Sequence, residues 1–132
     1  MREGGAVFRT WSLPYNRGSA ALARRHVERF ATDQELDRTT NVLALITSEL
    51  VSNAVLHGAE PIELTLRDEL DIVTLEVFDG DPAVNNVRSP AANDHAVGGK
   101  GLLIVAALAD RWGIRPSYTG KTVWATVCRE SE

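Results

Sequence analysis

Apolar side chains recur at helical spacing over residues 38–57, the longest such stretch in the chain. On a helical wheel they form one arc, which holds Val42, Leu43, Ile46, Leu50 and Ala54. Glu49, Asn53 and His57 fall within the same arc, and their spacing stacks them along one side of the helix. A carboxylate or an amide that faces the core costs several kcal/mol unless something pairs with it. The partner could be a neighbouring residue, a metal ion or a ligand in a pocket above the helix.

The same hydrophobic patterns predict two further helices and five strands. A helix follows Ser19, a plausible N-cap, and continues to residue 31 with Ala23, Val27 and Phe30 facing inward. A third helix opens at Gly98-Gly99-Lys100-Gly101. Alternating or continuous apolar positions predict strands at 6–13, 62–67, 72–78, 111–116 and 121–128. The order of these elements predicts an α/β (α+β) two-layer sandwich, with three helices on one face of a mostly antiparallel mixed sheet.

Residues 80–97 differ from the rest of the chain. They are rich in Gly, Asp, Asn and Pro and contain few large apolar side chains. A stretch of this length inside a compact domain is usually a functional loop or a lid. A surface insertion without fixed structure is the alternative.

Length and composition narrow the class of protein. A chain of 132 residues fits one domain, residues 1–132, and can bury a core without disulfides. The net charge of −4 gives no basic surface of the kind that nucleic acid favours. The single cysteine, Cys128, excludes an intrachain disulfide, and in its apolar run we expect an inert small hydrophobe. We find no signal-peptide pattern and no apolar run near the roughly 20 residues that span a membrane, and we therefore expect a cytoplasmic protein.

Four features together describe a nucleotide pocket. Glu49 and Asn53 lie on the core side of the long helix, and Asp79 directly follows the buried strand. A carboxylate at a strand end can accept a hydrogen bond from an exocyclic amine, and the Asn53 amide can offer an oxygen to Mg²⁺. The glycine-opened helix start can hold phosphates, and residues 80–97 can cover them. Glu49, one turn before Asn53, could then act as a general base near the terminal phosphate.

Several of these residues also have simpler explanations. The glycines around Lys100 lack the Lys-Ser/Thr ending of a Walker A loop, and a lysine at a helix start is often only solvated. His57 can cap the end of its own helix, which we expect Gly58 to terminate in the left-handed conformation. The outward side of the first helix is basic, either as a solvated face or as a partner surface, and it holds Arg24, Arg25 and Arg29.

The motifs Glu49-x-x-x-Asn53-Ala54, Asp79, Gly99-x-Gly101 and Gly120-Lys121-Thr122 occur in this order along the chain. Their combination resembles the GHKL ATPase superfamily, whose members share the Bergerat ATP-binding fold. The sequence Asn53-Ala54-x-x-His57-Gly58 and the small size are similar to the anti-sigma-factor serine/threonine kinases of bacteria. Two further stretches resemble stand-alone regulators of this kind, common in actinobacteria, and the whole resemblance covers about residues 12–128. These stretches are Leu108-Ala109-Asp110-Arg111-Trp112-Gly113 and Gly120-Lys121-Thr122-Val123-Trp124.

The resemblance implies a role for each matching residue. Asn53 would coordinate a Mg²⁺ ion that bridges the phosphates, and Glu49 would be the catalytic carboxylate. Asp79 would receive the adenine amino group, with Thr122 nearby through water. Residues 80–97 would form the ATP lid. The residues implied to bind ATP at the start of the third helix are Gly99, Lys100, Gly101 and Leu102.

The resemblance also implies an activity and its partners. A domain of this kind binds ATP and Mg²⁺, pairs through its sheet into a homodimer, binds a sigma factor, and phosphorylates a serine on an anti-anti-sigma (STAS-type) protein. No direct contact with nucleic acid or membrane is implied.

One part of the chain departs from the family pattern. The second box is often Asp-x-Gly-x-Gly, whereas this chain has Asp79-Gly80-Asp81-Pro82. The adenine-recognising aspartate is kept, but the glycines that help to hinge the lid are not. A non-catalytic, ATP-binding partner-switch module is therefore the second hypothesis. In a third, Glu49 and Asn53 only satisfy each other and backbone groups in the core.

Overall fold

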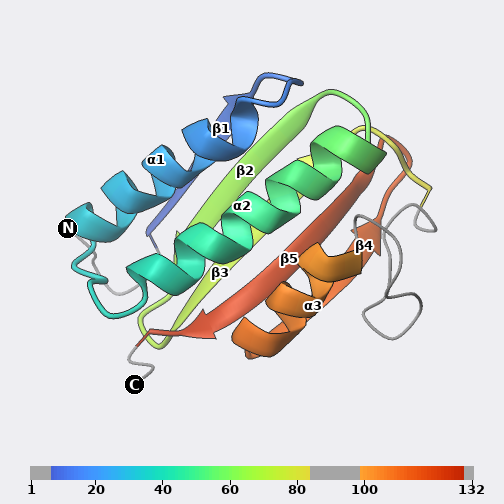
Figure 1. Ribbon diagram of the computed structural model, residues 1–132. Helices are drawn as coiled ribbons and strands as arrows, with labels where there is room; N and C mark the ends of the chain where they lie inside the picture. Colours follow the sequence, from blue (N-terminus) through green and yellow to red (C-terminus); the bar gives the residue numbers. More distant parts are fainter. Residues whose placement is uncertain (1–6, 84–98, 130–132) are drawn as a thin grey trace.

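The computed structural model describes residues 7–83 and 99–129, and these form a sheet covered on one face by helices (Figure 1). The strands are β1 (Val7–Leu13), β2 (Ile62–Asp68), β3 (Ile72–Asp79), β4 (Arg111–Pro116) and β5 (Lys121–Cys128). The helices are α1 (Ser19–Asp33), α2 (Thr40–His57) and α3 (Gly99–Leu108). Neighbouring strands are all antiparallel, in the order β1-β2-β3-β5-β4. The predicted two-layer α+β sandwich is confirmed.

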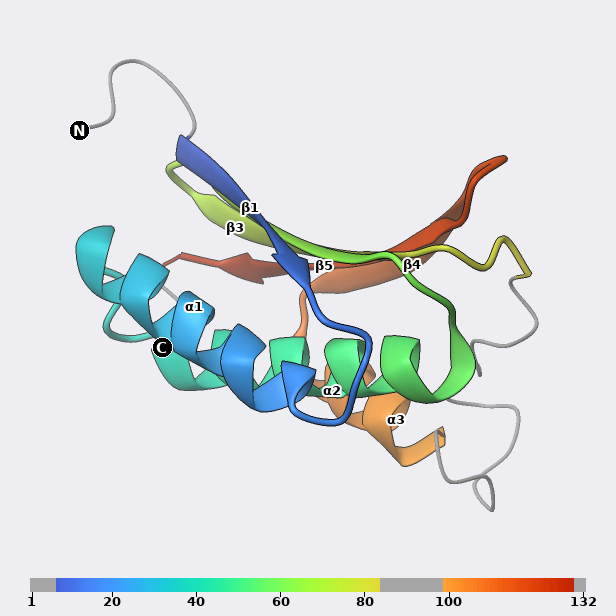
Figure 2. The same ribbon diagram turned by 90° about the horizontal axis from the view of Figure 1, so that it is seen from above.

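The hydrophobic core lies between the sheet and the helices, which all cover the same face (Figure 2). Every second side chain of the central strands is buried toward the helices, as strand geometry requires. In β3 these side chains are Val73, Leu75 and Val77, and the last inward position of the strand is Asp79. The alternation therefore carries a carboxylate into the core at the end of a central strand. Within the described residues, none of the helices is long and apolar enough to cross a membrane.

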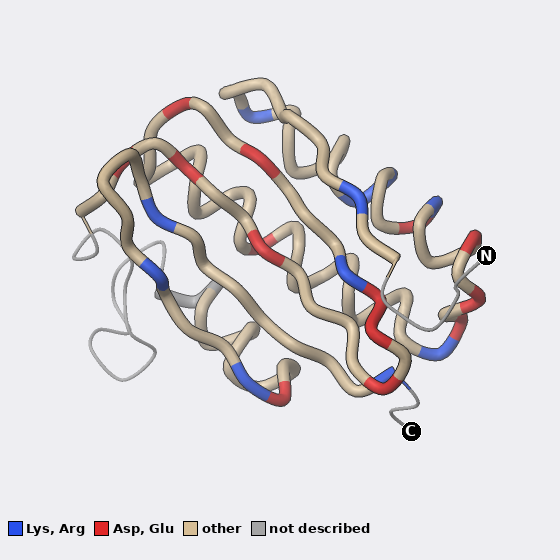
Figure 3. The backbone as a smooth tube through the Cα atoms, turned by 180° about the vertical axis from the view of Figure 1, so that it is seen from behind, with Lys and Arg blue, Asp and Glu red and all other residues tan. Residues whose placement is uncertain are grey.

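The other face of the sheet is open and carries charged positions on neighbouring strands (Figure 3). Glu76 of β3 lies between two arginines, 3.7 Å from Arg67 of β2 and 3.3 Å from Arg115 of β4. Trp124 of β5 packs over Gly113 of β4, where an added Cβ would lie 2.8 Å from the indole ring. This face is polar and aromatic, and it contributes little to the apolar core.

Helix α1 turns Ala23, Val27 and Phe30 inward as predicted. His26 stacks on Trp11 of β1 with a ring separation of 4.9 Å, which ties the helix to the edge strand. Burial, helped by the neighbouring Arg25 charge, lowers the pKa of His26, so the stacked ring stays neutral at neutral pH.

The ends of the elements show three differences from the sequence predictions. Gly18, not Ser19, is the N-cap of α1, and the Ser19 hydroxyl instead donates a hydrogen bond to the carbonyl of Pro14. The long helix begins at Thr40 rather than at residue 38. Cys128 is exposed, because it is the last residue of β5 and points to the open face, so it is not packed in the core as the small hydrophobe that we expected.

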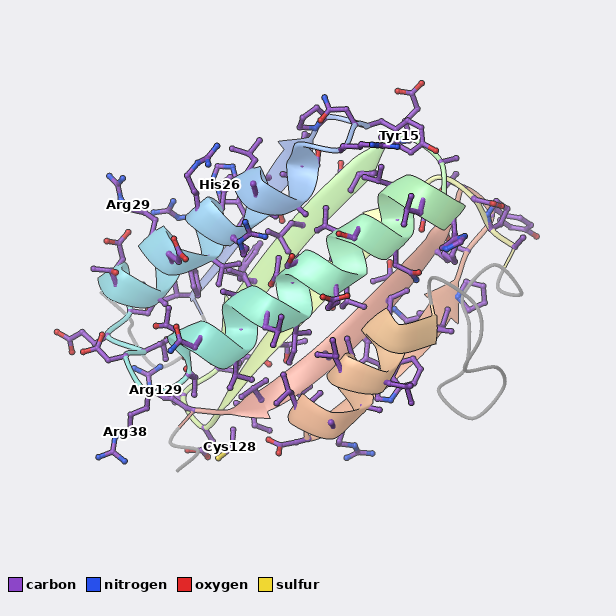
Figure 4. The ribbon with its side chains drawn as sticks, viewed as in Figure 1. Tyr15, His26, Arg29, Arg38, Cys128 and Arg129 are labelled. Carbon is purple, nitrogen blue, oxygen red and sulfur yellow. The ribbon has the colours of Figure 1, made fainter. Side chains whose placement is uncertain are left out.

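Arg129 joins the end of β5 to two other parts of the fold (Figure 4). One guanidinium nitrogen donates to the fully buried carboxylate of Asp68, and the other donates to the Gln34 carbonyl after α1 at 2.9 Å. The replacement Arg129→Ala should lower the free energy of unfolding by about 3 kcal/mol, since the buried Asp68 carboxylate would lose the charge-assisted hydrogen bond that Arg129 donates. Urea denaturation measures this loss. Arg115→Ala, which removes an exposed ion pair, is the control and should cost less than about 1 kcal/mol.

Candidate functional site

A small cavity lies where the C-terminal end of α2 meets the end of β3 and the beginning of β5. Its volume is about 10 Å³, close to the least space that holds one water molecule. The polar groups of three predicted segments meet here, although they are far apart in sequence. The cavity is lined by Leu50, Asn53, Ala54, His57, Gly58, Val77, Asp79, Lys121 and Val123.

Asp79 provides the negative charge at this cavity. It is the last residue of β3 and is only 2% exposed. Its Oδ1 atom accepts hydrogen bonds from the backbone N–H of Asp81 at 2.9 Å and, more weakly, from that of Ala59 at 3.4 Å. A third donor is the ammonium group of Lys121, whose Nζ lies 3.1 Å from the same oxygen. The carboxylate is thus held in place through one of its two oxygens.

Lys121 was not predicted as a site residue by sequence reasoning. It stands directly opposite Asp79 in the β3–β5 register and is 1% exposed. Its Nζ donates a second hydrogen bond, of 2.9 Å, to the Asp81 carbonyl. A signal was present, because Lys121 precedes Val123, Ala125 and Val127 on the inward side of the last strand. Without the strand pairing, however, nothing identified Asp79 as its partner.

Gly58 is required here for a reason other than the predicted one. Its backbone is extended (φ −106°, ψ −153°), so the expected left-handed helix end is wrong. A Cβ at this position would lie 2.5 Å from the Asp79 Cγ and 2.7 Å from the Ala54 carbonyl oxygen. The Gly58 carbonyl also accepts a hydrogen bond from the Tyr15 hydroxyl at 3.0 Å, and Figure 4 shows Tyr15 beside the end of α2. Glycine therefore allows the carboxylate to pack against the helix end.

Replacing Gly58 by alanine should displace the Asp79 carboxylate and weaken its contact with Lys121. We expect the free energy of unfolding to fall by about 1–3 kcal/mol, the usual cost of forcing atoms into a filled site. Urea denaturation measures the loss. Gly18→Ala is the matched control, since its Cβ would approach only the Asn16 side chain, at 3.2 Å. A Gly58→Ala protein as stable as this control would contradict the packing argument.

The polar side chains of α2 are buried to different degrees. Asn53 is 9% exposed and lines the cavity, whereas Glu49 is half-buried and is not among the lining residues. Within the described part of the chain, these two side chains make no hydrogen bond to each other. This argues against the hypothesis that they only satisfy one another. His57 also lines the cavity, and its buried Nε2 has no hydrogen-bond partner among the described residues.

The remaining predicted residues lie elsewhere or beyond the description. Thr122 stands opposite Phe78 on the open side of the sheet, so strand alternation points it away from Asp79. Leu102 is buried in the core and does not line the cavity. Helix α3 does begin at Gly99, as the phosphate-cradle prediction requires, but the side-chain surroundings of Lys100 and Gly101 lie outside the described residues. So does most of the predicted lid, residues 84–97.

The side chains around Asn53 suit a metal ion that binds together with a phosphate-containing ligand. In residues 7–83 and 99–129, no group of three or more His, Cys, Asp or Glu side chains could hold a metal ion. Asn53 offers one amide oxygen beside the cavity, and Mg²⁺ characteristically takes one or two protein ligands together with phosphate oxygens and water. The residues present fit a magnesium–nucleotide complex better than a resident metal centre.

Comparison with known proteins identifies a family for this chain. The family described as histidine kinase-like ATPase domain matches residues 13–127. This range includes the three helices, strands β2, β3 and β4, and β5 except its last residue, whereas only Leu13 of β1 lies within it. A search of curated proteins finds no match to this chain.

Proposed function

Since the chain belongs to the family of histidine kinase-like ATPase domains, we propose that it is an ATP-dependent serine/threonine kinase of the anti-sigma type. It binds ATP with Mg²⁺ and transfers the terminal phosphoryl group to a serine of a STAS-type partner. The observation that carries the proposal is the meeting of Asn53 from α2 and Asp79 from β3 on one cavity. Within the described residues, the hydrogen bonds to Asp79 all go to one carboxylate oxygen, which leaves the other for a ligand.

Each residue has a definite task in the proposed reaction. The free oxygen of Asp79 accepts a hydrogen bond from the adenine amine, and the Asn53 amide oxygen binds the ion that accompanies the phosphates. Mg²⁺, when bound, neutralises charge that develops on the phosphates. Glu49 takes the proton from the serine hydroxyl. The serine oxygen meanwhile forms a bond to the γ-phosphorus, and the bond from this phosphorus to ADP breaks, so that ADP leaves. Gly99, Lys100 and Gly101 bind phosphate at the start of α3.

The cavity is too small for a purine as it stands, so binding requires neighbouring groups to move. The volume of about 10 Å³ accommodates one water molecule. We propose that residues 80–97 act as the ATP lid, since Asp81 near the beginning of this segment is held at the cavity by Lys121. Lids that close over a nucleotide exclude water from the reaction.

The partners follow from the resemblance to anti-sigma kinases. We propose that this cytoplasmic protein binds a sigma factor in one state and a STAS protein in the other, and that it forms a homodimer through its sheet. The uncovered face of the sheet supports the last point, since Phe8 and Ile72 on it are 59% and 44% exposed. The basic outward face of α1 is available to an acidic partner.

A transfer assay tests the proposed activity. Purified protein is incubated with γ-labelled ATP, Mg²⁺ and candidate STAS proteins, and each STAS protein is matched by a variant with alanine at the phosphorylated serine. We expect label on one STAS protein, lost in its serine-to-alanine variant and in EDTA. If the protein binds ATP but labels none of the STAS proteins, the proposed kinase activity is rejected.

The second candidate is a partner-switch module that binds ATP without transferring phosphate. Asp81 and Pro82 favour it, because Asp81 replaces the first glycine of the Asp-x-Gly-x-Gly pattern and a proline follows it in the part that helps to hinge the lid. In that case, ATP changes the affinity for the sigma factor, and no label reaches any STAS protein. A pull-down of the sigma factor with and without Mg·ATP distinguishes the two candidates.

A further inference from the structure

Lys121 is a buried cation to which the proposed reaction gives no task. Its side chain is 2% exposed and touches two groups of the site, the Asp79 carboxylate at 3.1 Å and the Asp81 carbonyl at 2.9 Å. A lysine is rarely buried to this degree, because an ammonium ion loses much hydration energy in the core. The two hydrogen bonds replace part of that hydration, and they connect the end of β3 to the segment after it.

The two carboxylate oxygens of Asp79 have different surroundings. Lys121, the Asp81 N–H and the Ala59 N–H all donate to Oδ1. Charge-assisted hydrogen bonds of this kind hold a carboxylate in one rotamer. The other oxygen, Oδ2, is then the one that an incoming amine can meet, in an orientation set before the ligand arrives. A preorganised acceptor loses less conformational freedom on binding than a mobile one.

The second contact of Lys121 bears on the departure from the family pattern. Asp81 stands where the family pattern has a flexible glycine, and Pro82 follows it. Through the Asp81 carbonyl, Lys121 fixes the first residues of this segment relative to Asp79. The same ammonium group therefore positions the base acceptor and anchors the segment that begins beside it.

We propose that Lys121 is the positioning residue for Asp79, and that it sets the preference of the site for purines that carry a 6-amino group. The inference rests on the proposed ATP-binding function and adds a determinant of base specificity to it. Lys121 does not contact the base. It acts by holding Oδ1, so that Oδ2 is aimed at the amine.

The test compares ATP with purine riboside triphosphate, which lacks the 6-amino group. Dissociation constants for both nucleotides are measured with Mg²⁺ on the wild type and on Lys121→Met. The wild type should prefer ATP by about 10-fold or more, the usual effect of a hydrogen bond to a charged group. In Lys121→Met the preference should fall to about 3-fold or less. Lys121→Gln, with a neutral donor, provides the same test if the methionine variant does not fold.

Arg129→Ala controls for lost stability, because it breaks the ion pair between Arg129, which follows β5, and the buried Asp68 at the end of β2. This pair lies at the opposite end of the strands from Asp79. It should leave the preference for ATP unchanged. If Lys121→Met weakens the binding of both nucleotides equally and keeps the wild-type preference for ATP, Lys121 is only structural and the inference is overturned. Failure of the folded wild type to bind either nucleotide would instead reject the proposed function itself.

Discussion

Glu49→Gln should abolish phosphoryl transfer while the protein still binds Mg·ATP. We expect the transfer rate to fall by at least about 100-fold, since the amide cannot accept the serine proton. The dissociation constant for Mg·ATP should stay within about 3-fold of the wild type, because Glu49 is half-buried on α2 and does not line the base cavity. Single-turnover transfer of labelled phosphate measures the first quantity, and calorimetric titration measures the second.

Glu63→Gln is the matched control for this prediction. Glu63 is an exposed carboxylate on β2, and its side chain points to the open face of the sheet. The control should transfer phosphate at the wild-type rate. A Glu49→Gln protein that does the same would remove Glu49 from the mechanism, and a parallel loss of ATP binding would make it a binding residue instead.

Asp79→Asn should have the largest effect on stability. The substitution leaves the Lys121 ammonium group buried without its counter-ion, and removing one partner of a buried ion pair costs about 3–5 kcal/mol. ATP affinity should fall by about 10-fold or more, because the adenine amine loses a charged acceptor. Urea denaturation measures the free energy of unfolding, and titration at a temperature where the variant is folded measures affinity.

The double variant Asp79→Asn/Lys121→Met separates the two effects. It removes both charges, so most of the lost stability should return, whereas the affinity for ATP should not. If the double variant is as unstable as the sum of the two single variants, the ion pair is not the source of the effect. Recovery of ATP binding in the double variant would show that Asp79 does not read the base.

The layers of this fold could be predicted from the sequence because each element has a clear period. Strict alternation in 62–67 and the alternation of Leu75 and Val77 with Thr74 and Glu76 before Asp79 identify strands that are buried on one face. The apolar arc of α2 identifies a central helix, and two of the three polar residues within it, Asn53 and His57, line the cavity. Asn53 and Asp79 were found in this way, since a polar residue at a core position is conspicuous in a one-dimensional pattern.

What the sequence could not supply is the register between distant strands. Lys121 acquires its partner only because β5 pairs with β3 across 42 positions of sequence, which sets it opposite Asp79. The same register turns Thr122 to the open face, although the resemblance to the family places this residue near the adenine. Gly58 shows a similar limit: a glycine after a helix usually indicates a left-handed end, and here it makes room for a carboxylate from another strand.

The central claim is that the cavity at the end of α2 is the base site of a magnesium–nucleotide pocket. Calorimetric titration of the wild type and of Asn53→Ala with ATP, each in Mg²⁺ and in EDTA, tests it most directly. We predict saturable binding of one ATP per chain by the wild type in Mg²⁺, weakened by about 10-fold or more in EDTA. Asn53→Ala should bind equally weakly under both conditions. A folded wild-type protein that shows no binding of ATP with Mg²⁺ would contradict the account.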